Sequence, residues 1–348
     1  MMHAAVLTRY GNIEWKKTPM PAVKPDEVLV KVSYAGICGT DQHIFRGNFE
    51  GRTHLPMIQG HEFAGVITET GKSVKRFRKG DRVAVDPIFW CGTCAACERK
   101  HYPACASLKL LGVDVDGGFA EFAAAKEFML YLIPDSISDR HAALVEMLSI
   151  GFHACRRADV SKDDMVAIWG AGRVGQAILR ACRTLTANTV FLVDVLQNRL
   201  DKVLKAYPDV TAVNAVECNP LDVIQEKTMG RGVDVSFEAV GHATPVEGMA
   251  PPVRLCIQSI RGAGTVCVLG LADDPTPLVM KELIWKEAKI VASRVTHGEF
   301  ATTIAHLKKG GLFPDLLISS EMPASKAQEA FDMLDRRPED HLKVLLKL

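Results

Sequence analysis

The sequence has almost no excess of charge of either sign. Lys and Arg together number 42 and Asp and Glu together number 41, which leaves a formal net charge of +1 at pH 7. A chain without a dominant charge has no long-range field that would draw it to nucleic acid or to an anionic membrane surface. We therefore expect no nucleic-acid partner and no membrane partner, and a small ligand that is recognised by a local site.

Long apolar runs are also missing. No run of about 18 apolar residues occurs, and a helix that spans a bilayer needs roughly that length. The first residues, MMHAAVLTRYGN, do not combine a basic stretch with an apolar one, as a secretory leader would. Internal repeats and low-complexity segments are absent as well. We expect a cytoplasmic protein made of folded domains.

The pattern of short apolar runs predicts two domains in the 348 residues. Residues 1 to about 150 hold β-type runs such as EVLVKVSYAGI and FAGVITET, separated by Gly, Pro and Asp. From about residue 160, the strand-like MVAIW and TVFLVDV flank the helix-periodic GRVGQAILRACRTL. This alternation predicts an α/β fold with a doubly wound parallel sheet after a β-rich part. The pattern alone leaves open whether the tail from about 293, which ends in HLKVLLKL, extends the sheet or returns to the first domain.

A glycine-rich turn follows the first buried strand of the second part. GAGRVG supplies Gly170, Gly172 and Gly175 and opens a helix, whose N-terminal N–H groups can bind phosphates. Asp194 ends the next strand, 194 − 175 = 19 residues further on, where an acid can bind the ribose hydroxyls of a dinucleotide. The pattern predicts a site for NAD rather than NADP, although the nearby Arg199 keeps NADP as an alternative.

Four cysteines are bunched in CGTCAACERKHYPAC. Cys91, Cys94, Cys97 and Cys105 can close a tetrahedral zinc shell that has no open position, which is typical of a structural zinc. A disulfide pair and an iron–sulfur cluster are the alternatives.

Another stretch, IQGHEFAG, places His61 and Glu62 side by side between two glycines. Neither an amphipathic helix nor an alternating strand explains that pair. Taken alone, each residue would be expected in the core or on a solvated face. Together with Cys38 they supply a thiolate, an imidazole and a carboxylate, which is a donor set that a catalytic zinc uses when it keeps one position open.

Several motifs in a fixed order carry a resemblance to a known family. AGICGTDQHIF, GHEFAG, the four-cysteine segment, GGFAEF, VEMLSIGFHACRR and GAGRVG followed by VDV resemble the zinc-dependent medium-chain dehydrogenases over essentially the whole chain. Within that superfamily the chain is most similar to the polyol and sugar-acid branch around sorbitol dehydrogenase. The resemblance implies a GroES-like catalytic domain formed by residues 1–153 and 293–348, a Rossmann NAD-binding domain of residues 154–292 between them, and a homo-oligomer, either dimer or tetramer.

The resemblance also implies two zinc ions per chain, one structural and one catalytic. Cys38, His61 and Glu62 would bind the catalytic ion, and Glu146 would be a fourth ligand or hold the water on the zinc. Asp41 matches an acid near that zinc.

Other matching positions concern the proton and the substrate. Thr40 and His43 match residues that pass the alcohol proton through the cofactor ribose to solvent. Arg294 matches an arginine that faces the substrate.

The predicted reaction is hydride transfer from a secondary hydroxyl of a polyol or sugar acid to NAD, which gives a ketone. L-threonine 3-dehydrogenase and an alditol-phosphate dehydrogenase are the alternatives. The former typically has Asp and Pro where this chain has Glu146 and Met147. A non-enzymatic zinc scaffold fits less well, because the cofactor motif is complete. Pro251 and Pro252 depart from the family pattern and should interrupt or restart a helix.

Overall fold

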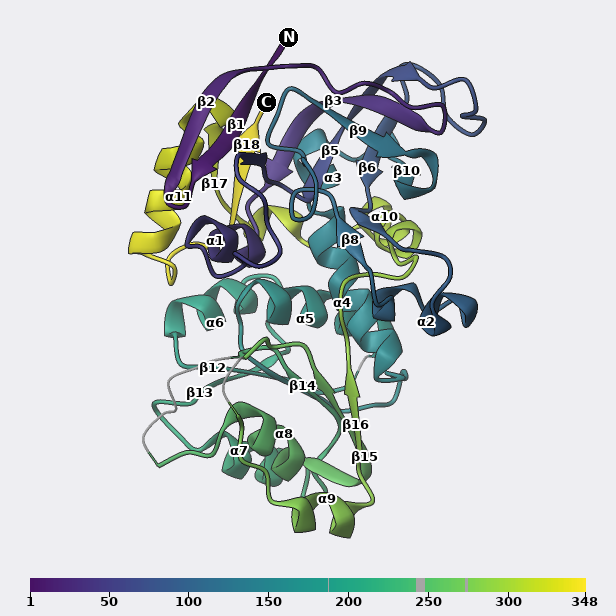
Figure 1. Ribbon diagram of the computed structural model, residues 1–348. Coiled ribbons are helices and arrows are strands. Elements are labelled where there is room, and N and C mark those ends of the chain that lie inside the picture. Colours follow the sequence, from purple (N-terminus) through teal and green to yellow (C-terminus); the bar gives the residue numbers. More distant parts are fainter. Residues whose placement is uncertain (187, 242–247, 273–274) are drawn as a thin grey trace. The chain divides into compact units, whose positions relative to one another are not determined.

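The computed structural model describes residues 1–186, 188–241, 248–272 and 275–348. The chain forms two compact units (Figure 1). The first, here called the β-rich unit, consists of Met1–Glu146, Thr296–Gly310 and Leu317–Leu348. The second, here called the α/β unit, consists of Met147–Val295 and Gly311–Leu316.

The β-rich unit consists mostly of short strands. They are β1 (Met2–Arg9), β2 (Asn12–Thr18), β3 (Glu27–Gly36), β4 (Met57–Ile58), β5 (Glu62–Thr70), β6 (Arg82–Val85), β7 (Ile88–Phe89), β8 (Lys109–Leu110), β9 (Phe122–Lys126), β10 (Leu130–Leu132), β17 (Ile318–Pro323) and β18 (Lys343–Lys347). Its helices are α1 (Gly39–Phe45), α2 (Ala95–Glu98), η1 (Tyr102–Ala104), η2 (Glu127–Met129), α3 (Asp139–Ala142), α10 (Phe300–Lys309), η4 (Ala324–Lys326) and α11 (Ala327–Arg336). Helix α4 (Val145–Arg157) begins in this unit and continues in the other.

The main sheet of the β-rich unit joins both ends of the chain. Its order is β10-β6-β5-β3-β18-β17, with β9 also paired to β3. Strand β18 runs antiparallel to β3, with Leu345 opposite Gly36, and β5 lies on the other side of β3, with Glu62 opposite Gly36. The chain end therefore returns to the β-rich unit, which answers the question that the sequence pattern left open.

The α/β unit contains one parallel sheet with helices. The strands are β11 (Val166–Trp169), β12 (Val190–Asp194), β13 (Thr211–Asn214), β14 (Val233–Glu238), β15 (Ile260–Val268) and β16 (Lys289–Ala292). The helices are α5 (Arg173–Leu185), α6 (Gln197–Leu204), α7 (Pro220–Lys227), α8 (Pro252–Ser259), α9 (Met280–Lys286) and the short η3 (Pro314–Leu316).

The strand order of this sheet is β13-β12-β11-β14-β15-β16, and every neighbouring pair is parallel. Strands β11, β12 and β14 are buried along their whole length, which explains their unbroken apolar sequences. From β11 the chain adds β12 and β13 on one side of the sheet, and it then adds β14, β15 and β16 on the other side. The switch point lies between β11 and β14, and ligands of such sheets bind there, beyond the carboxyl ends of the strands. The predicted α/β fold class is confirmed.

The two adjacent prolines mark a helix start. Helix α8 begins at Pro252, and Pro251 is the residue that precedes its first turn. Proline suits the first helical position, where its missing N–H has no partner to lose. The sequence predicts that these prolines interrupt or restart a helix in VEGMAPPVRLCIQSIRGAG (residues 246–264). The structure describes the start at Pro252, and residues 246 and 247 lie outside the described residues.

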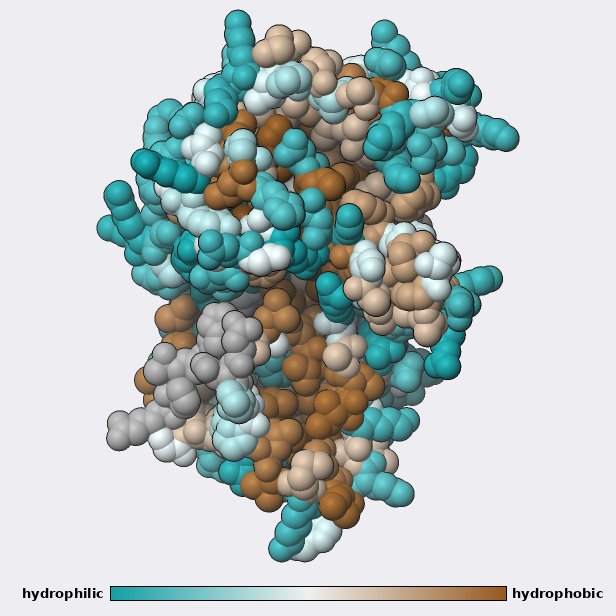
Figure 2. All heavy atoms as spheres, viewed as in Figure 1, coloured by the Kyte–Doolittle hydropathy of each residue, from teal (hydrophilic) through white to brown (hydrophobic). Residues whose placement is uncertain are grey.

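The surface of the α/β unit carries an apolar area. Met280, Ile284, Trp285 and Ile290 are exposed on α9 and on β16, the last strand at that edge of the sheet. Figure 2 shows brown spheres over the end of the unit where α9 lies. Among the described residues, no helix is both long enough and apolar enough to cross a membrane.

Candidate metal and dinucleotide sites

The four cysteines of the segment 91–105 meet around one point. The Sγ–Sγ distances are 3.9 Å for Cys91 and Cys97, 3.6 Å for Cys94 and Cys97, and 3.6 Å for Cys91 and Cys105. Sulfurs at about 2.3 Å from a tetrahedral zinc lie about 3.8 Å apart, so this spacing fits a zinc shell. A disulfide would need about 2.05 Å, and all four cysteines are free. Backbone and side-chain hydrogen bonds from Thr93 lower the pKa of Cys91 to about 6, which favours the thiolate that a metal binds.

A second donor cluster combines Cys38, His61 and Glu62. One ligand atom from each lies within 4.8 Å of the others. Cys38 precedes the first turn of α1, and Glu62 is the first residue of β5. His61 is 4% exposed and Glu62 is 0% exposed, so neither is a solvated surface residue. The two neighbours His61 and Glu62 thus point toward a common centre, and the donor set fits a zinc with an open position.

Asp41 forms hydrogen bonds with both segments that supply these donors. Its carboxylate accepts hydrogen bonds from the main-chain N–H of Cys38 at 2.8 Å and of Gly60 at 3.3 Å. The same carboxylate lies 3.5 Å from Nδ1 of His61. Burial opposes protonation of His61, but the charges of Asp41 and Cys38 outweigh it and raise the pKa of His61 well above its ordinary value. Negative charge from Asp41 and Cys38 thus surrounds His61.

Lys343 forms a fully buried ion pair with Glu62. Its Nζ lies 2.7 Å from Oε1 and 2.5 Å from Oε2 of Glu62, and 3.2 Å from the carbonyl oxygen of Ile37. Both side chains are 0% exposed. Gly36 leaves room for this pair, because a Cβ there would lie 2.5 Å from Oε2 of Glu62. Sequence reasoning missed Lys343, since it stands 281 residues from its partner and no local motif contains it.

Glu146 lies in the interior close to this cluster. It is 4% exposed, and among the described residues its Oε2 has no hydrogen-bond partner. Burial, followed by the charge of Glu62, raises the pKa of Glu146 to about 8. A buried carboxyl with an unsatisfied oxygen suits a partner that the protein itself does not supply, such as a water, a hydroxyl or an ion.

The other predicted residues lie as follows. Thr40 and His43 are both on α1 and both partly buried, and Nδ1 of His43 lies 3.1 Å from Nδ2 of Asn48. Arg294 is exposed in the α/β unit, whereas the metal donors belong to the β-rich unit. Their roles in the reaction stay predictions.

The glycine turn of the α/β unit lies between β11 and α5. A Cβ on Gly175 would lie 1.7 Å from the carbonyl oxygen of Gly170, so helix α5 packs against the turn only because residue 175 is glycine. Asp194 stabilises this turn, because its carboxylate accepts hydrogen bonds from the N–H of Ala171 at 2.6 Å and of Leu196 at 2.8 Å. Nη1 of Arg199 lies 3.8 Å from the same carboxylate. Asp194 and Arg199 thus lie together at the glycine turn, where the sequence predicts the ribose of a dinucleotide.

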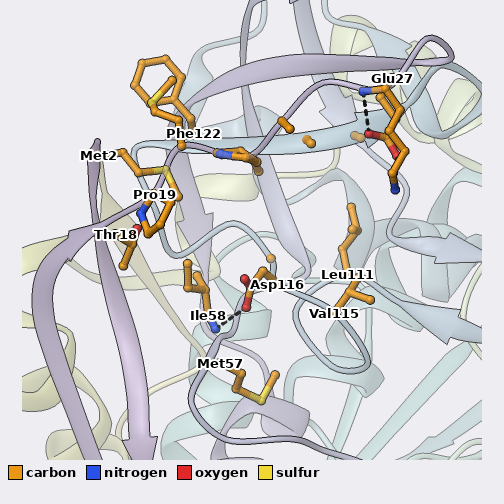
Figure 3. A pocket seen from close by; sticks show the side chains of 18 of the residues that line it. Met2, Thr18, Pro19, Glu27, Met57, Ile58, Leu111, Val115, Asp116 and Phe122 are labelled. Atoms are coloured by element: carbon orange, nitrogen blue, oxygen red, sulfur yellow. Dashed lines mark hydrogen bonds and ion pairs between the residues drawn. The ribbon is translucent and has the colours of Figure 1, made fainter. Parts of the chain in front are cut away.

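One described cavity of the β-rich unit has none of these donors in its lining. A hollow of about 680 Å³ in the β-rich unit is lined mostly by apolar side chains, among them Met2, Met57, Leu111 and Phe122 (Figure 3). None of the predicted site residues lines it. Its size alone does not make it a catalytic site.

Two family models match parts of the chain. Residues 24–135 match the alcohol dehydrogenase GroES-like domain, and residues 174–309 match the zinc-binding dehydrogenase family. Sorbitol dehydrogenase of Bacillus subtilis (strain 168) is 31% identical, over 99% of this chain and 97% of that protein. D-arabitol-phosphate dehydrogenase of Enterococcus avium is 30% identical, over 93% of this chain and 91% of that protein.

A solved structure matches the whole chain as well. It is a short chain alcohol dehydrogenase (rspB) from E. coli CFT073 complexed with the cofactor NADH, which has a TM-score of 0.91 and 28% identity, and the match covers 100% of this chain and 99% of that one.

The ion pair of Lys343 and Glu62 leads to a prediction about stability. In zinc-free protein, Lys343→Met should lower the free energy of unfolding by about 3–5 kcal/mol, because Glu62 is left buried without a cation. Adding Glu62→Gln should recover most of that loss, and zinc should reduce the loss in the single variant. Chemical denaturation with and without zinc measures all three.

A matched control is Lys326→Met, which removes the exposed ion pair with Glu329 and should cost less than about 1 kcal/mol. If Lys343→Met and Lys326→Met proved equally mild in zinc-free protein, the structural role given to the buried pair would be wrong.

Proposed function

The chain belongs to the zinc-binding alcohol dehydrogenase family, and from this membership we propose that it oxidises a secondary hydroxyl of a polyol or sugar acid to a ketone, with NAD as hydride acceptor. The observation that carries the proposal is the cluster of Cys38, His61 and Glu62. Three different donor types, two of them almost fully buried, have ligand atoms within 4.8 Å of one another. A structural shell is normally closed by four ligands, whereas three protein donors leave a position for substrate.

The chemistry divides between the bound groups and the chain. A zinc ion in this cluster supplies a Lewis acid that lowers the pKa of a hydroxyl, and NAD supplies the hydride acceptor. Asp41 fixes the segments of Cys38 and His61 through its main-chain hydrogen bonds. Lys343 balances the charge of Glu62. Glu146 offers its unpartnered oxygen to a water or a substrate hydroxyl.

The alcohol proton needs a route away from the reacting carbon. We assign this route to Thr40 and His43, which follow Cys38 on the same short helix α1. Both side chains are only partly buried, unlike His61 and Glu62, so a path from the cluster toward solvent along α1 is consistent with their burial. Thr40 would be the inner member and His43 the outer one.

The relatives support a polyhydroxylated substrate. They include a sorbitol dehydrogenase and a D-arabitol-phosphate dehydrogenase, so the class spans free and phosphorylated polyols. Arg294, in the proposal, binds a carboxylate or several hydroxyls with its planar guanidinium group. An alditol phosphate is the second candidate, since the same guanidinium can bind a phosphate.

The cofactor choice rests on Asp194. Asp194 is 8% exposed and its carboxylate lies at the glycine turn, where a negative charge opposes a 2′-phosphate. Arg199 at 3.8 Å is already engaged with that carboxylate, which reduces its attraction for a phosphate. We therefore favour NAD over NADP.

A cytoplasmic homo-oligomer, dimer or tetramer, completes the proposal. The exposed apolar side chains of α9 and β16 support association, because β16 ends the sheet and an edge strand leaves backbone groups unpaired. Analytical ultracentrifugation that found only the 38.0 kDa monomer at micromolar concentration would contradict the oligomer.

The substrate class is tested by turnover of a panel that contains an alditol, an aldonate, an alditol phosphate, L-threonine and ethanol. With NAD, an alditol or aldonate should have the highest kcat/KM, and dialysis against a chelator should abolish the activity until zinc is restored. Arg294→Ala should raise KM for the best substrate at least tenfold, while the exposed control Arg9→Ala should leave it unchanged. Ethanol or L-threonine as the best substrate would refute the proposed class.

The cofactor choice is tested by comparing kcat/KM for NAD and NADP. The wild type should favour NAD at least tenfold. Asp194→Asn removes the charge but keeps one acceptor oxygen for the turn, so it should narrow the preference, and Arg199→Ala should not. The role given to Asp194 would be wrong if the wild type preferred NADP. It would also be wrong if only Arg199→Ala changed the ratio of kcat/KM for the two cofactors, because Arg199 would then determine the cofactor.

A further inference from the structure

A second cavity of the β-rich unit is lined by residues that have no role in the proposed reaction. Its volume is about 260 Å³, and its lining includes Asp86, Trp90, Tyr102, Phe128, Tyr131 and His297. None of the candidate metal donors lines it. Aromatic side chains thus surround a space that also contains one carboxylate.

The aromatic rings form a connected wall. Trp90 and Tyr102 are stacked with their ring centroids 3.9 Å apart, and Phe128 lies 4.9 Å from Trp90. His297 meets Tyr102 edge-on at 5.5 Å. Trp90 and Tyr102 cover one face of each other, which leaves each ring one further face. The face of an aromatic ring carries partial negative charge and attracts a cation.

Asp86 is buried in this lining with few partners. It is 6% exposed, and its oxygens accept from the Thr296 hydroxyl at 3.2 and 3.1 Å and from the Ile88 N–H at 3.4 Å. A hydroxyl has one proton to donate, so the two Thr296 contacts share it. Among the described residues, no Lys, Arg or His forms an ion pair with Asp86. Burial, and to a smaller extent the charge of Glu299, raises the pKa of Asp86 to about 7.

The charged group next to Asp86 is another carboxylate, so it does not neutralise Asp86. Glu299 is also buried, at 5% exposed, and its carboxylate accepts a hydrogen bond from the main-chain N–H of His297. A hydroxyl ligand could add a hydrogen bond to Asp86 but no positive charge. A substituted ammonium group would add both a charge for the carboxylate and a cation for the rings.

We propose that this cavity binds a small alkylammonium compound, with Asp86 as its counter-ion and with Trp90, Tyr102 and Phe128 as its aromatic wall. The compound is a ligand separate from the substrate of the proposed reaction, because none of the candidate metal donors lines the cavity. The site does not depend on zinc or NAD, so its failure would leave the proposed reaction untouched.

The test compares choline with 3,3-dimethylbutan-1-ol, which has the same shape but no charge. Isothermal titration calorimetry of the full-length wild type, together with tryptophan fluorescence as a report on Trp90, should give at least tenfold tighter binding of choline. Asp86→Asn and Trp90→Leu should each weaken choline binding at least tenfold. The control Asp116→Asn, which changes an exposed carboxylate in the same unit, should leave the binding unchanged.

Thermal unfolding of each variant shows whether it is folded, and the wild-type comparison stands without any variant. Equal affinity for the two compounds, no choline binding, or unchanged binding in a folded Asp86→Asn would each overturn the proposal. Choline should not reduce NAD, because the cavity contains none of the candidate metal donors. NAD reduction with choline as the sole alcohol would place the compound at the metal cluster as a substrate and would also overturn the proposal.

Discussion

The buried ion pair between Lys343 and Glu62 is the interaction on which the metal-binding part of the structure depends. Two groups that are 0% exposed cannot hold charges without each other, because the interior does not solvate them. The pair joins the start of β18, near the chain end, to the start of β5, where two metal donors stand. It therefore couples the return of the chain end to the formation of the candidate catalytic site.

The same pair explains why the cluster is suited to a cation. Lys343 provides one positive charge, whereas Cys38, Glu62, Asp41 and Glu146 can each carry a negative one. Burial, and then the charge of Glu62, raises the pKa of Glu146, whereas the charges of Asp41 and Cys38 raise the pKa of His61 against the effect of burial. A divalent ion among the donors would add positive charge beside these groups and displace protons from its ligands. The four-cysteine shell is different, because all of its ligands come from one loop.

Features that depend on residues close in sequence could be predicted from the sequence. The spacing of Cys91 to Cys105 determines the zinc shell, and the glycines 170, 172 and 175 determine the turn, because each lies in one short segment. The α/β fold was accessible for the same reason, through apolar strands that alternate with helices. Lys343 and the lining of the Asp86 cavity could not be predicted, since Thr296 contacts Asp86 from 210 residues away and only the tertiary fold brings such partners together.

The role of Asp194 could be predicted from the sequence only in part. Its spacing from Gly175 predicted a place at the dinucleotide turn, but not that its oxygens would already accept hydrogen bonds from Ala171 and Leu196. The central claim, that Cys38, His61 and Glu62 hold a catalytic metal, is tested most directly by anomalous X-ray scattering from crystals of zinc-loaded protein. Difference maps on both sides of the zinc absorption edge should contain two peaks per chain, one among the four cysteines and one within bonding distance of Cys38 and His61. A single peak at the four cysteines, with Lys343 and Glu62 paired and no metal beside them, would contradict the account.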